Sequence, residues 1–482
     1  MIPRTGQIIK NLTTGGNVLH TGGGWSIIGW KRLGDVAERL NRGKKAVKQT
    51  ASIVCLARNL KGSVMFKKQE SHTLSLILVL LLVQAVSAVD WPQFRGAGGQ
   101  GISKEKDLPV TWSETENVVW KTGLPGYGAS SPIALDGRIY VTCYSGYGME
   151  SESGKMEDLT LHVVCVEGKT GKIIRDTKIE PTLPESKSVR DHGYAAATPA
   201  TDGEYIYVFF GKSGVLKFDK DGKEIWRTGV GTKTHGWGSG TSPILYEDLV
   251  IINASVESGE LVGINKADGK EVWRSGGMDS SWNTPHLFET ADGKKGLAVS
   301  VQGWILGFDP KTGKELWRCK GIDDYICPSI VSEKGVLYAM GGRSSKAIAV
   351  RSGGRGDVTE THKVWEVDVG SLVSSPVVYE GHLYWVSNNA QTAYCLGLGD
   401  GAIKYSERVN VLPYASAMLA EGRIYVVTRN DGTLVLAAKP QFEQLALNKL
   451  EDKSTFDASA IVCDGKLILR SNENLYCIGN GK

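Results

Sequence analysis

Short apolar runs follow one another from residue 117 to the end of the chain and are separated by turn residues. Val, Ile and Tyr dominate these runs, as they do in β-strands. Many runs form pairs around an acidic residue and a glycine, as in residues 133–143 around Asp136-Gly137 and residues 377–387 around Glu380-Gly381. Because such dipeptides favour tight hairpins, the pattern predicts antiparallel strands joined by short turns.

The strand pattern repeats in units, each of which begins with a small residue beside proline or alanine. From Pro199 to Pro243, Pro285 and Pro328 the spacing is 44, 42 and 43 residues. This length holds four short strands and their turns, so each unit is predicted to form one four-stranded antiparallel blade. The eight starts are Ser131-Pro132, Thr198-Pro199, Ser242-Pro243, Thr284-Pro285, Pro328-Ser329, Ser375-Pro376, Ser416-Ala417 and Ser459-Ala460.

A second repeated position carries a large aromatic ring on the fourth strand of a unit. The phrase Gly-Lys-Glu-apolar-Trp-Arg occupies residues 222–227, 269–274 and 313–318, while Arg175 replaces the ring in the first full unit and the copy near Phe442 cannot be aligned. A ring at a fixed offset from a turn predicts side chains that wedge neighbouring blades together, and a ligand cage is the alternative. The aromatic residues in this position are Trp120, Trp226, Trp273, Trp317, Trp365 and Tyr405.

The two ends of the repeat region complement each other. Residues 117–122 contain the fourth strand of a unit without the three strands before it, and the chain ends just after a third strand that finishes at Ile478. Joining them closes a ring and removes the open edge that a linear stack would expose. The sequence therefore predicts an all-β fold, an eight-bladed β-propeller of four-stranded antiparallel blades over residues 117–482, with the N-terminal strand completing the last blade.

The Asp/Thr-Gly-Lys-x-x-Trp phrase, the small-residue start and the count of eight resemble the pyrroloquinoline-quinone (PQQ) type of propeller repeat. That family includes quinoprotein alcohol dehydrogenases and the propeller lipoprotein of the bacterial outer-membrane barrel-assembly machinery. Residues 90–96, Asp-Trp-Pro-Gln-Phe-Arg-Gly, and residues 108–112 look like the lead-in of secreted PQQ-like propellers from planctomycete-type bacteria. The resemblance covers about residues 90 to 480 and implies the fold, but no single chemistry, because this scaffold hosts both enzymes and binders.

An export signal is predicted before the repeats. Basic Lys67 and Lys68, an apolar run at residues 74–83 and small residues before Ala88 indicate a signal peptide at residues 65–88, cleaved after Ala88. The run is too short for a membrane span. We therefore expect a periplasmic or secreted protein without an integral membrane span in its mature form.

Two further segments flank this signal. Residues 1–64 are interpreted as a disordered upstream extension that a start at Met65 would leave out, and a basic tail that binds nucleic acid is the alternative. Residues 89–116 are interpreted as a lead-in segment. The whole chain carries a net charge of +4, but residues 1–64 hold eleven Lys or Arg against two acidic residues and residues 65–88 add one positive charge, so the remainder carries −6. An acidic propeller offers nucleic acid no electrostatic footprint, and we expect no such partner.

Seven cysteines follow the predicted signal peptide, and none forms a Cys-x-x-Cys pair. A haem or cysteine metal site is therefore not predicted. Cys143 with Cys165, and Cys463 with Cys477, lie on neighbouring predicted strands, so both disulfides and buried thiols remain open. No Ser-His-Asp motif is evident.

The candidate site lies in the loops that lead from the fourth strand of one blade to the first strand of the next. In a propeller these loops converge on one face of the centre. Here they do not repeat one another, and they predict an aromatic-rich funnel for a quinone, a sugar or a peptide; rings that merely plug the channel are the alternative. The candidate lining residues are Tyr127, His192, Tyr194, His235, Trp237, Ser281, Trp282, Asn283, Tyr325, Tyr414 and Asp457.

Two functions fit such a funnel. The first is an exported, monomeric binding or assembly scaffold for a protein or polysaccharide of the cell envelope, or for a small ligand. The alternative implied by the resemblance is a PQQ- and calcium-dependent alcohol or sugar dehydrogenase, with Asp323 or Asp324 as candidate base. The chain lacks the adjacent cysteine pair that such enzymes often carry and has little length beyond the propeller. We therefore favour the scaffold and assign no catalytic residue and no metal ligand.

Overall fold

The computed structural model describes residues 91–148, 154–190, 192–290 and 292–480. The chain divides into two units, Met1–Val86 and Ser87–Lys482, and these residues belong to the second. The interpreted extension at residues 1–64, the predicted signal peptide and its cleavage site lie outside the described residues. Within the described ranges, no helix is long and apolar enough to cross a membrane.

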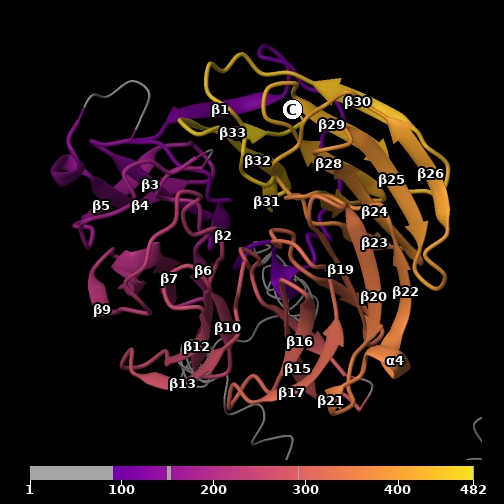
Figure 1. Ribbon diagram of the computed structural model, residues 1–482. Helices are drawn as coiled ribbons and strands as arrows, with labels where there is room; N and C mark the ends of the chain where they lie inside the picture. The colour runs from indigo at the N-terminus through magenta and orange to yellow at the C-terminus, as the bar shows by residue number, and fades with distance from the viewer. Residues whose placement is uncertain (1–90, 149–153, 191, 291, 481–482) are drawn as a thin grey trace, which may run out of the picture. The chain divides into compact units, whose positions relative to one another are not determined.

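The described part of the chain forms eight sheets, and Figure 1 shows them arranged radially, in chain order, around a common centre. Each sheet begins with a short buried strand near the centre and ends with a more exposed strand at the rim. The prediction of an eight-bladed all-β propeller is confirmed. We number the sheets as blades 1 to 8 in the order of their first strands.

The strand bounds follow this numbering. Blade 1 contains β2 (Ile133–Leu135), β3 (Arg138–Ser145), β4 (Thr160–Glu167) and β5 (Ile173–Ile179). Blade 2 contains β6 (Ala200–Thr201), β7 (Tyr205–Phe209), β8 (Val215–Asp219) and β9 (Glu224–Thr228). Blade 3 contains β10 (Ile244–Tyr246), β11 (Leu249–Ala254), β12 (Glu260–Asn265) and β13 (Glu271–Gly276). Blade 4 contains β14 (His286–Glu289), β15 (Lys295–Val301), β16 (Trp304–Phe308), β17 (Glu315–Lys320) and the added β21 (Gly356–Asp357).

The second half of the ring continues in the same way. Blade 5 contains β18 (Val331–Glu333), β19 (Val336–Gly341), β20 (Lys346–Arg351) and β22 (Lys363–Val367). Blade 6 contains β23 (Val377–Tyr379), β24 (His382–Ser387), β25 (Thr392–Gly397) and β26 (Ile403–Arg408). Blade 7 contains β27 (Met418–Ala420), β28 (Arg423–Val427), β29 (Thr433–Ala437) and β30 (Gln444–Asn448). Blade 8 contains β31 (Ile461–Cys463), β32 (Lys466–Arg470), β33 (Asn474–Ile478) and β1 (Val118–Gly123). The helical pieces are η2 (Ala97–Gly99), η3 (Met156–Asp158), η4 (Gly211–Ser213) and α4 (Thr359–His362).

The N-terminal strand closes the ring as predicted. β1 pairs antiparallel with β33, so that Trp120 lies opposite Cys477 and Gly123 opposite Asn474. One blade departs from the predicted four strands. β21 comes from the long connection between the third and fourth strands of blade 5 and pairs in parallel with β17 of blade 4, opposite Trp317 and Arg318. Blade 4 is therefore a five-stranded sheet, because that connection is longer than a tight turn.

Strand register identifies the copies of the aromatic position that the sequence left unaligned. In each blade a bulge in the third and fourth strands precedes the pair that contains this position, as in Gly263 opposite Trp273. Arg175 lies opposite Cys165 in blade 1. In blade 7 the equivalent pair is Val435 opposite Ala446. Ala446, four residues after Phe442, therefore occupies the aromatic position in blade 7.

Four of the tryptophans in this position pack on a turn glycine of the next blade, namely Trp120, Trp226, Trp273 and Trp365. A Cβ placed on Gly269 would lie 2.7 Å from the ring of Trp226, and one placed on Gly313 would lie 2.2 Å from the ring of Trp273. Trp226 Nε1 also donates a hydrogen bond of 3.1 Å to the carbonyl oxygen of Lys266, which is in that turn. We infer that these rings hold consecutive blades together, since glycine alone leaves room for them.

A closed ring of hydrogen bonds links the first strands of all eight blades. At each start, the backbone N–H of the small residue donates to the hydroxyl oxygen of the equivalent residue in the next blade, at 2.9–3.1 Å. The last bond, from Ser459 N to Ser131 Oγ, joins blade 8 to blade 1. The eight residues, which we call the waist, are Ser131, Thr198, Ser242, Thr284, Ser329, Ser375, Ser416 and Ser459.

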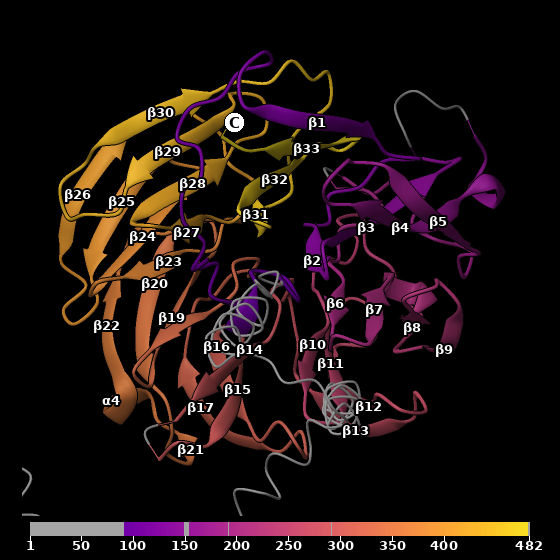
Figure 2. The same ribbon diagram turned by 180° about the vertical axis from the view of Figure 1, so that it is seen from behind.

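The lead-in segment crosses the centre on the opposite side from the loops that precede the waist. Figure 2 shows it running from β1 past β28 and β27 to the middle of the ring. Trp91 pairs with Ala134 of blade 1, and Ile102 pairs with Leu419 of blade 7. The guanidinium of Arg95 is buried, and among its acceptors are the carbonyl oxygens of Gln100 at 2.9 Å and Ala417 at 3.4 Å. The segment therefore closes one end of the central channel.

Candidate functional site

A blind cavity of about 360 Å³ occupies the centre of the ring, and we call it the funnel. All eight waist residues line it, so every blade contributes to its wall. Phe94 of the lead-in segment forms its floor. The volume falls in the range of small-molecule sites, about 300–1,000 Å³.

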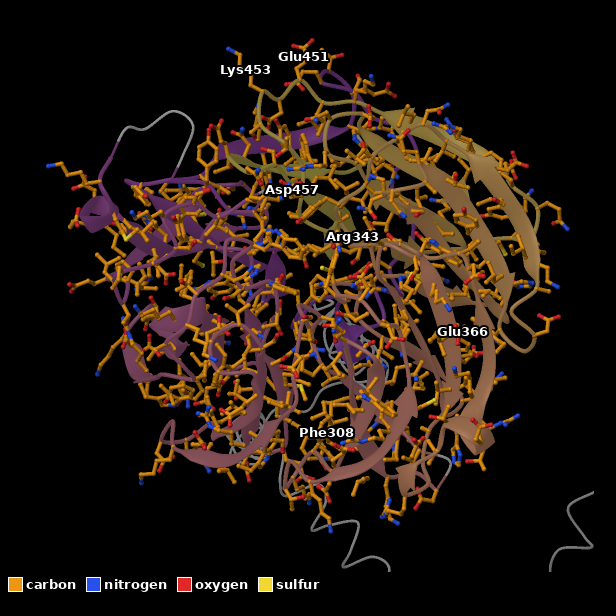
Figure 3. All side chains as sticks on the ribbon, in the orientation of Figure 1. Phe308, Arg343, Glu366, Glu451, Lys453 and Asp457 are labelled. Carbon is orange, nitrogen blue, oxygen red and sulfur yellow. The ribbon has the colours of Figure 1, made fainter. Side chains whose placement is uncertain are left out.

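The mouth of the funnel is aromatic and carries two arginines. Trp237, Trp282, Tyr325 and Tyr414 line it together with His192, Arg190 and Arg343. The rings of Trp237 and Tyr325 lie 4.9 Å apart at 69°, and the rings of Trp237 and Trp282 lie 5.1 Å apart at 52°. The guanidinium carbon of Arg343 lies 4.9 Å from the centre of the Tyr325 ring. In Figure 3, Arg343 and Asp457 are labelled close to the centre of the ring.

Six of the eleven predicted lining residues line the funnel: His192, Trp237, Trp282, Tyr325, Tyr414 and Asp457. The other five have different surroundings. Tyr127 and Tyr194 both pack on Tyr144, with ring centres 6.4 and 5.3 Å away. His235 packs edge-on against the Trp237 and Trp282 rings, with ring centres 5.5 and 5.2 Å away.

Ser281 and Asn283 are buried in a polar network of blades 3 and 4 rather than exposed to the funnel. Asn253 Nδ2 donates to Ser281 Oγ at 2.9 Å and to the carbonyl oxygen of Asn283 at 3.1 Å. Ser281 Oγ in turn donates to the carbonyl oxygen of Ser300 at 2.9 Å. These side chains bond to each other and to the backbone, although the amide oxygens of Asn253 and Asn283 are buried without a hydrogen-bond partner among the described residues.

The carboxylates near the funnel are already engaged. Asp457 is buried, and Arg429 Nε lies 2.8 Å from its Oδ1 while Asn472 Nδ2 donates to its Oδ2 at 3.1 Å. Burial raises the pKa of Asp457, and the neighbouring Arg429 opposes that rise. Asp324 accepts a hydrogen bond of 2.7 Å from the backbone N–H of Arg343, and neither it nor the exposed Asp323 lines the funnel.

This donor set does not fit the calcium ion of a quinoprotein dehydrogenase. Calcium takes six to eight oxygen ligands at about 2.3–2.6 Å. Among the described residues that line the funnel, Asp457 alone carries a carboxylate, and the guanidinium of Arg429 already occupies one of its oxygens. The described residues therefore give no support to a calcium-assisted step, and none is derived.

Several residues that line the funnel were not predicted from the sequence. The waist residues were recognised as repeat markers, but their hydroxyl groups were not predicted to face a cavity. Phe94, Arg190, Arg343 and Cys327 also line the funnel. Burial raises the pKa of the Cys327 thiol to about 12, so it is protonated at neutral pH. A lone Phe or Arg in a loop carries no pattern that marks it for a central site.

The loop that carries His235 and Trp237 is anchored by Glu257. The backbone N–H groups of Thr232 and Lys233 donate to the carbonyl oxygen of Glu257 at 3.1 and 3.2 Å. Ser239 Oγ donates to the Glu257 carboxyl group. That carboxyl is buried, and burial raises its pKa to about 7. The loop that forms this wall of the funnel is therefore held by a buried carboxyl group whose ionisation destabilises the fold.

Glu257→Gln is expected to stabilise the protein above pH 7. Because the folded-state pKa is raised, the contribution of Glu257 to stability is complete below its unfolded pKa near 4.5 and is lost as the pH rises through about 7. The neutral amide removes this loss, about 3 kcal/mol at pH 8. Thermal unfolding of both proteins at pH 5 and pH 8 checks this, with the exposed Glu360→Gln as control. A variant less stable than the parent at pH 8 contradicts it.

Blade 1 contains a Ser-His-Asp network that the sequence did not reveal. Ser145 Oγ lies 2.8 Å from His162 Nε2, and His162 Nδ1 lies 2.7 Å from Asp176 Oδ1. These residues come from three consecutive strands, and His162 is 2% exposed. It lies opposite Cys143, whose side chain belongs to the core shared with blade 8. The network thus satisfies both nitrogens of a buried histidine.

The cysteines considered for disulfides do not form them. Cys143 and Cys165 are free buried thiols, and Cys477 is likewise a free thiol. Cys143 lies opposite His162 in the strand register, and Cys165 lies opposite Tyr140. Of the two readings left open by the sequence, buried thiols hold for these three residues.

Part of the chain is similar to a known protein family. Residues 160–280 match the family model described as outer membrane protein assembly factor BamB. Among the curated proteins compared, none matches the chain.

Solved structures share the fold over most of the chain. BamB from Moraxella catarrhalis is 13% identical, with 75% of this chain and 97% of that chain covered and a TM-score of 0.54. Quinohemoprotein alcohol dehydrogenase from Comamonas testosteroni is 11% identical, with coverage of 84% and 82% and a TM-score of 0.56. A europium-containing methanol dehydrogenase is 11% identical, with coverage of 83% and 100% and a TM-score of 0.57. At these identities the similarity establishes the fold alone. The chain is therefore an eight-bladed β-propeller, of which residues 160–280 are similar to the BamB family model.

Proposed function

We propose that this protein is a non-catalytic binding and assembly scaffold of the cell envelope, and that it holds its partner at the mouth of the funnel. One observation carries the proposal: loops and waist residues of all eight blades converge on a single blind cavity. The wall repeats in its waist but not in its mouth, which is typical of a rigid frame that presents specific contacts. The partner is a protein or a polysaccharide.

The family match over part of the chain and the predicted export signal support this role. The matched residues 160–280 include Arg190, His192 and Trp237, three residues of the mouth. The family model is named for an outer membrane protein assembly factor. The signal peptide predicted at residues 65–88 would bring this chain to the periplasm or outside the cell.

Site-specific photo-crosslinking in cells that make the protein tests the role. A photoreactive amino acid replaces Arg343 at the mouth or, as a matched control, the exposed Lys311 in a turn on the far side of blade 4. We expect a discrete adduct from position 343 and none from position 311. Protease and glycosidase digestion of the adduct distinguishes a protein from a polysaccharide. Adducts from position 311 alone, or from neither position, contradict the proposal.

A second experiment addresses catalysis. The purified protein is titrated with PQQ and Ca²⁺ and assayed with alcohols, sugars and a redox dye. We expect no turnover, because the described carboxylates near the funnel are engaged with Arg429 or with the backbone of Arg343. Dye reduction that depends on PQQ would replace the scaffold with a dehydrogenase.

A further inference from the structure

The waist presents eight hydroxyl groups to the cavity with their hydrogens unused. Each waist oxygen accepts one backbone N–H from the preceding blade, as Thr198 Oγ1 does from Ser131 and Ser459 Oγ does from Ser416. Within the part of the chain that the structure describes, none of the eight donates its own hydrogen to a protein acceptor. A hydroxyl has one donor and two acceptor sites. Each waist group therefore keeps one donor and one acceptor site for a ligand.

The charges of the mouth favour an anion. Arg190 and Arg343 line the funnel and are exposed to solvent. Arg343 forms a long, partly exposed ion pair of 3.7 Å with Asp324, while Asp457 is paired with Arg429. Guanidinium groups bind carboxylates strongly because they donate two parallel hydrogen bonds. A ligand that brings a carboxylate therefore matches both the arginines and the unused hydroxyl hydrogens below them.

The aromatic rings of the mouth form a cup rather than a slot. Tyr325 stands at 69° to Trp237 and at 89° to Trp282, and the two tryptophans are tilted by 52°. A flat fused-ring ligand needs parallel faces on its two sides, and these three rings offer none. A saturated sugar ring presents C–H groups in several directions and hydroxyl groups around its edge. It therefore suits tilted rings above a waist that both donates and accepts.

We propose that the funnel binds the end of a carboxylate-bearing sugar chain, with the terminal acidic sugar at the waist and the next sugar packed against the rings of the mouth. Entry is by a chain end because Phe94 and the lead-in segment close the floor. The carboxylate lies within reach of Arg190 and Arg343. This inference rests on the proposed function for the face that binds, and it names the ligand class.

Calorimetric titration of the mature protein with trigalacturonate tests the inference. The uncharged trigalactose, which has the same ring but no carboxylate, is the matched ligand. We expect saturable binding of trigalacturonate, at least about ten-fold tighter than trigalactose, since each charge-assisted hydrogen bond contributes strongly. Binding is expected to weaken in 0.5 M salt because the arginines are exposed. Equal affinity for the two sugars, or no binding of either, overturns the inference.

Variants locate the binding. Arg343→Gln and Arg190→Gln are each expected to weaken trigalacturonate binding about ten-fold, while Arg355→Gln, an exposed arginine outside the funnel, leaves it unchanged. Thermal unfolding confirms that the variants fold. Binding that survives the loss of both mouth arginines overturns the site. If PQQ alone binds, or if only a protein adduct forms from position 343, the sugar inference fails; in the second case the scaffold proposal stands. If trigalacturonate binds but no adduct forms in cells, the sugar inference stands and the scaffold proposal fails.

Discussion

Trp273→Ala is expected to lower the free energy of unfolding by about 3–5 kcal/mol. The ring is 8% exposed and fills the space between blades 3 and 4. A Cβ added to Gly263 or to Gly313 would lie 2.3 or 2.2 Å from it. Because glycines face the ring on both sides, no neighbouring side chain can fill the cavity that alanine leaves. Chemical denaturation followed by tryptophan fluorescence and far-ultraviolet circular dichroism measures the loss.

The matched control is Arg175→Ala, at the equivalent position of blade 1. The side chain of Arg175 is 38% exposed, and its ion pair with Asp221 spans 3.6 Å at the surface. Exposed ion pairs contribute about 0–1 kcal/mol, so the control is expected to lose less than about 1 kcal/mol. Equal losses in the two variants would show that the aromatic ring does not hold the blades together.

Arg95→Ala is expected to release the lead-in segment and to cost about 3–5 kcal/mol. Arg95 is buried, and its guanidinium donates to carbonyl oxygens of Gln100, Ser375 and Ala417. Its burial lowers its pKa to about 9, which still leaves it charged at neutral pH. Removing the side chain leaves these buried oxygens without their donor and opens a cavity beside Phe94. Thermal unfolding measures the cost.

Limited proteolysis reports the release itself. Trypsin can cut the lead-in segment after the exposed Lys106, and cleavage is expected to be faster in Arg95→Ala than in the parent. Lys104→Ala removes a charge from the same segment but touches no blade carbonyl, and it is expected to leave both stability and cleavage at Lys106 unchanged. A slow cleavage in Arg95→Ala would show that the lead-in is held by other contacts.

Local patterns were enough to predict the ring. Alternating strands, turn dipeptides and a repeat of about 43 residues fix the blade, and the missing strand at each end of the repeat region fixes the closure between β1 and β33. The signals for a blade are local because most strands of a blade pair with the next strand along the chain. The addition of β21 to blade 4 was not predicted, because it pairs residues of one blade with the edge of another.

The direction of loop side chains could not be predicted in the same way. His192 and Tyr194 are two residues apart, yet His192 lines the funnel and Tyr194 packs edge-on against Tyr144. Tertiary contacts decide such orientations, since loops have no period that assigns alternate residues to a face. The composition of the loops therefore indicated a site without separating its lining from its supports.

The waist was visible in the sequence but not interpretable there. Each of its hydrogen bonds joins residues of different blades, separated by 41 residues between Ser375 and Ser416 and by 328 between Ser131 and Ser459. The role of a serine before proline appears only when all eight first strands surround one axis. Phe94 is similar, because its place at the floor depends on where Arg95 anchors the lead-in.

The pairing of Val118 with Ile478 also sets the order of events when the molecule is made. β1 is synthesised first and its partner β33 last. Blade 8 therefore stays incomplete until the whole chain has been synthesised and, if it is exported, translocated. Contacts between such distant residues form slowly and leave an open strand edge in the meantime. A chain cut a few residues before Ile478 would lose this last step, and with it the continuity of the waist that depends on Ser131 and Ser459 meeting.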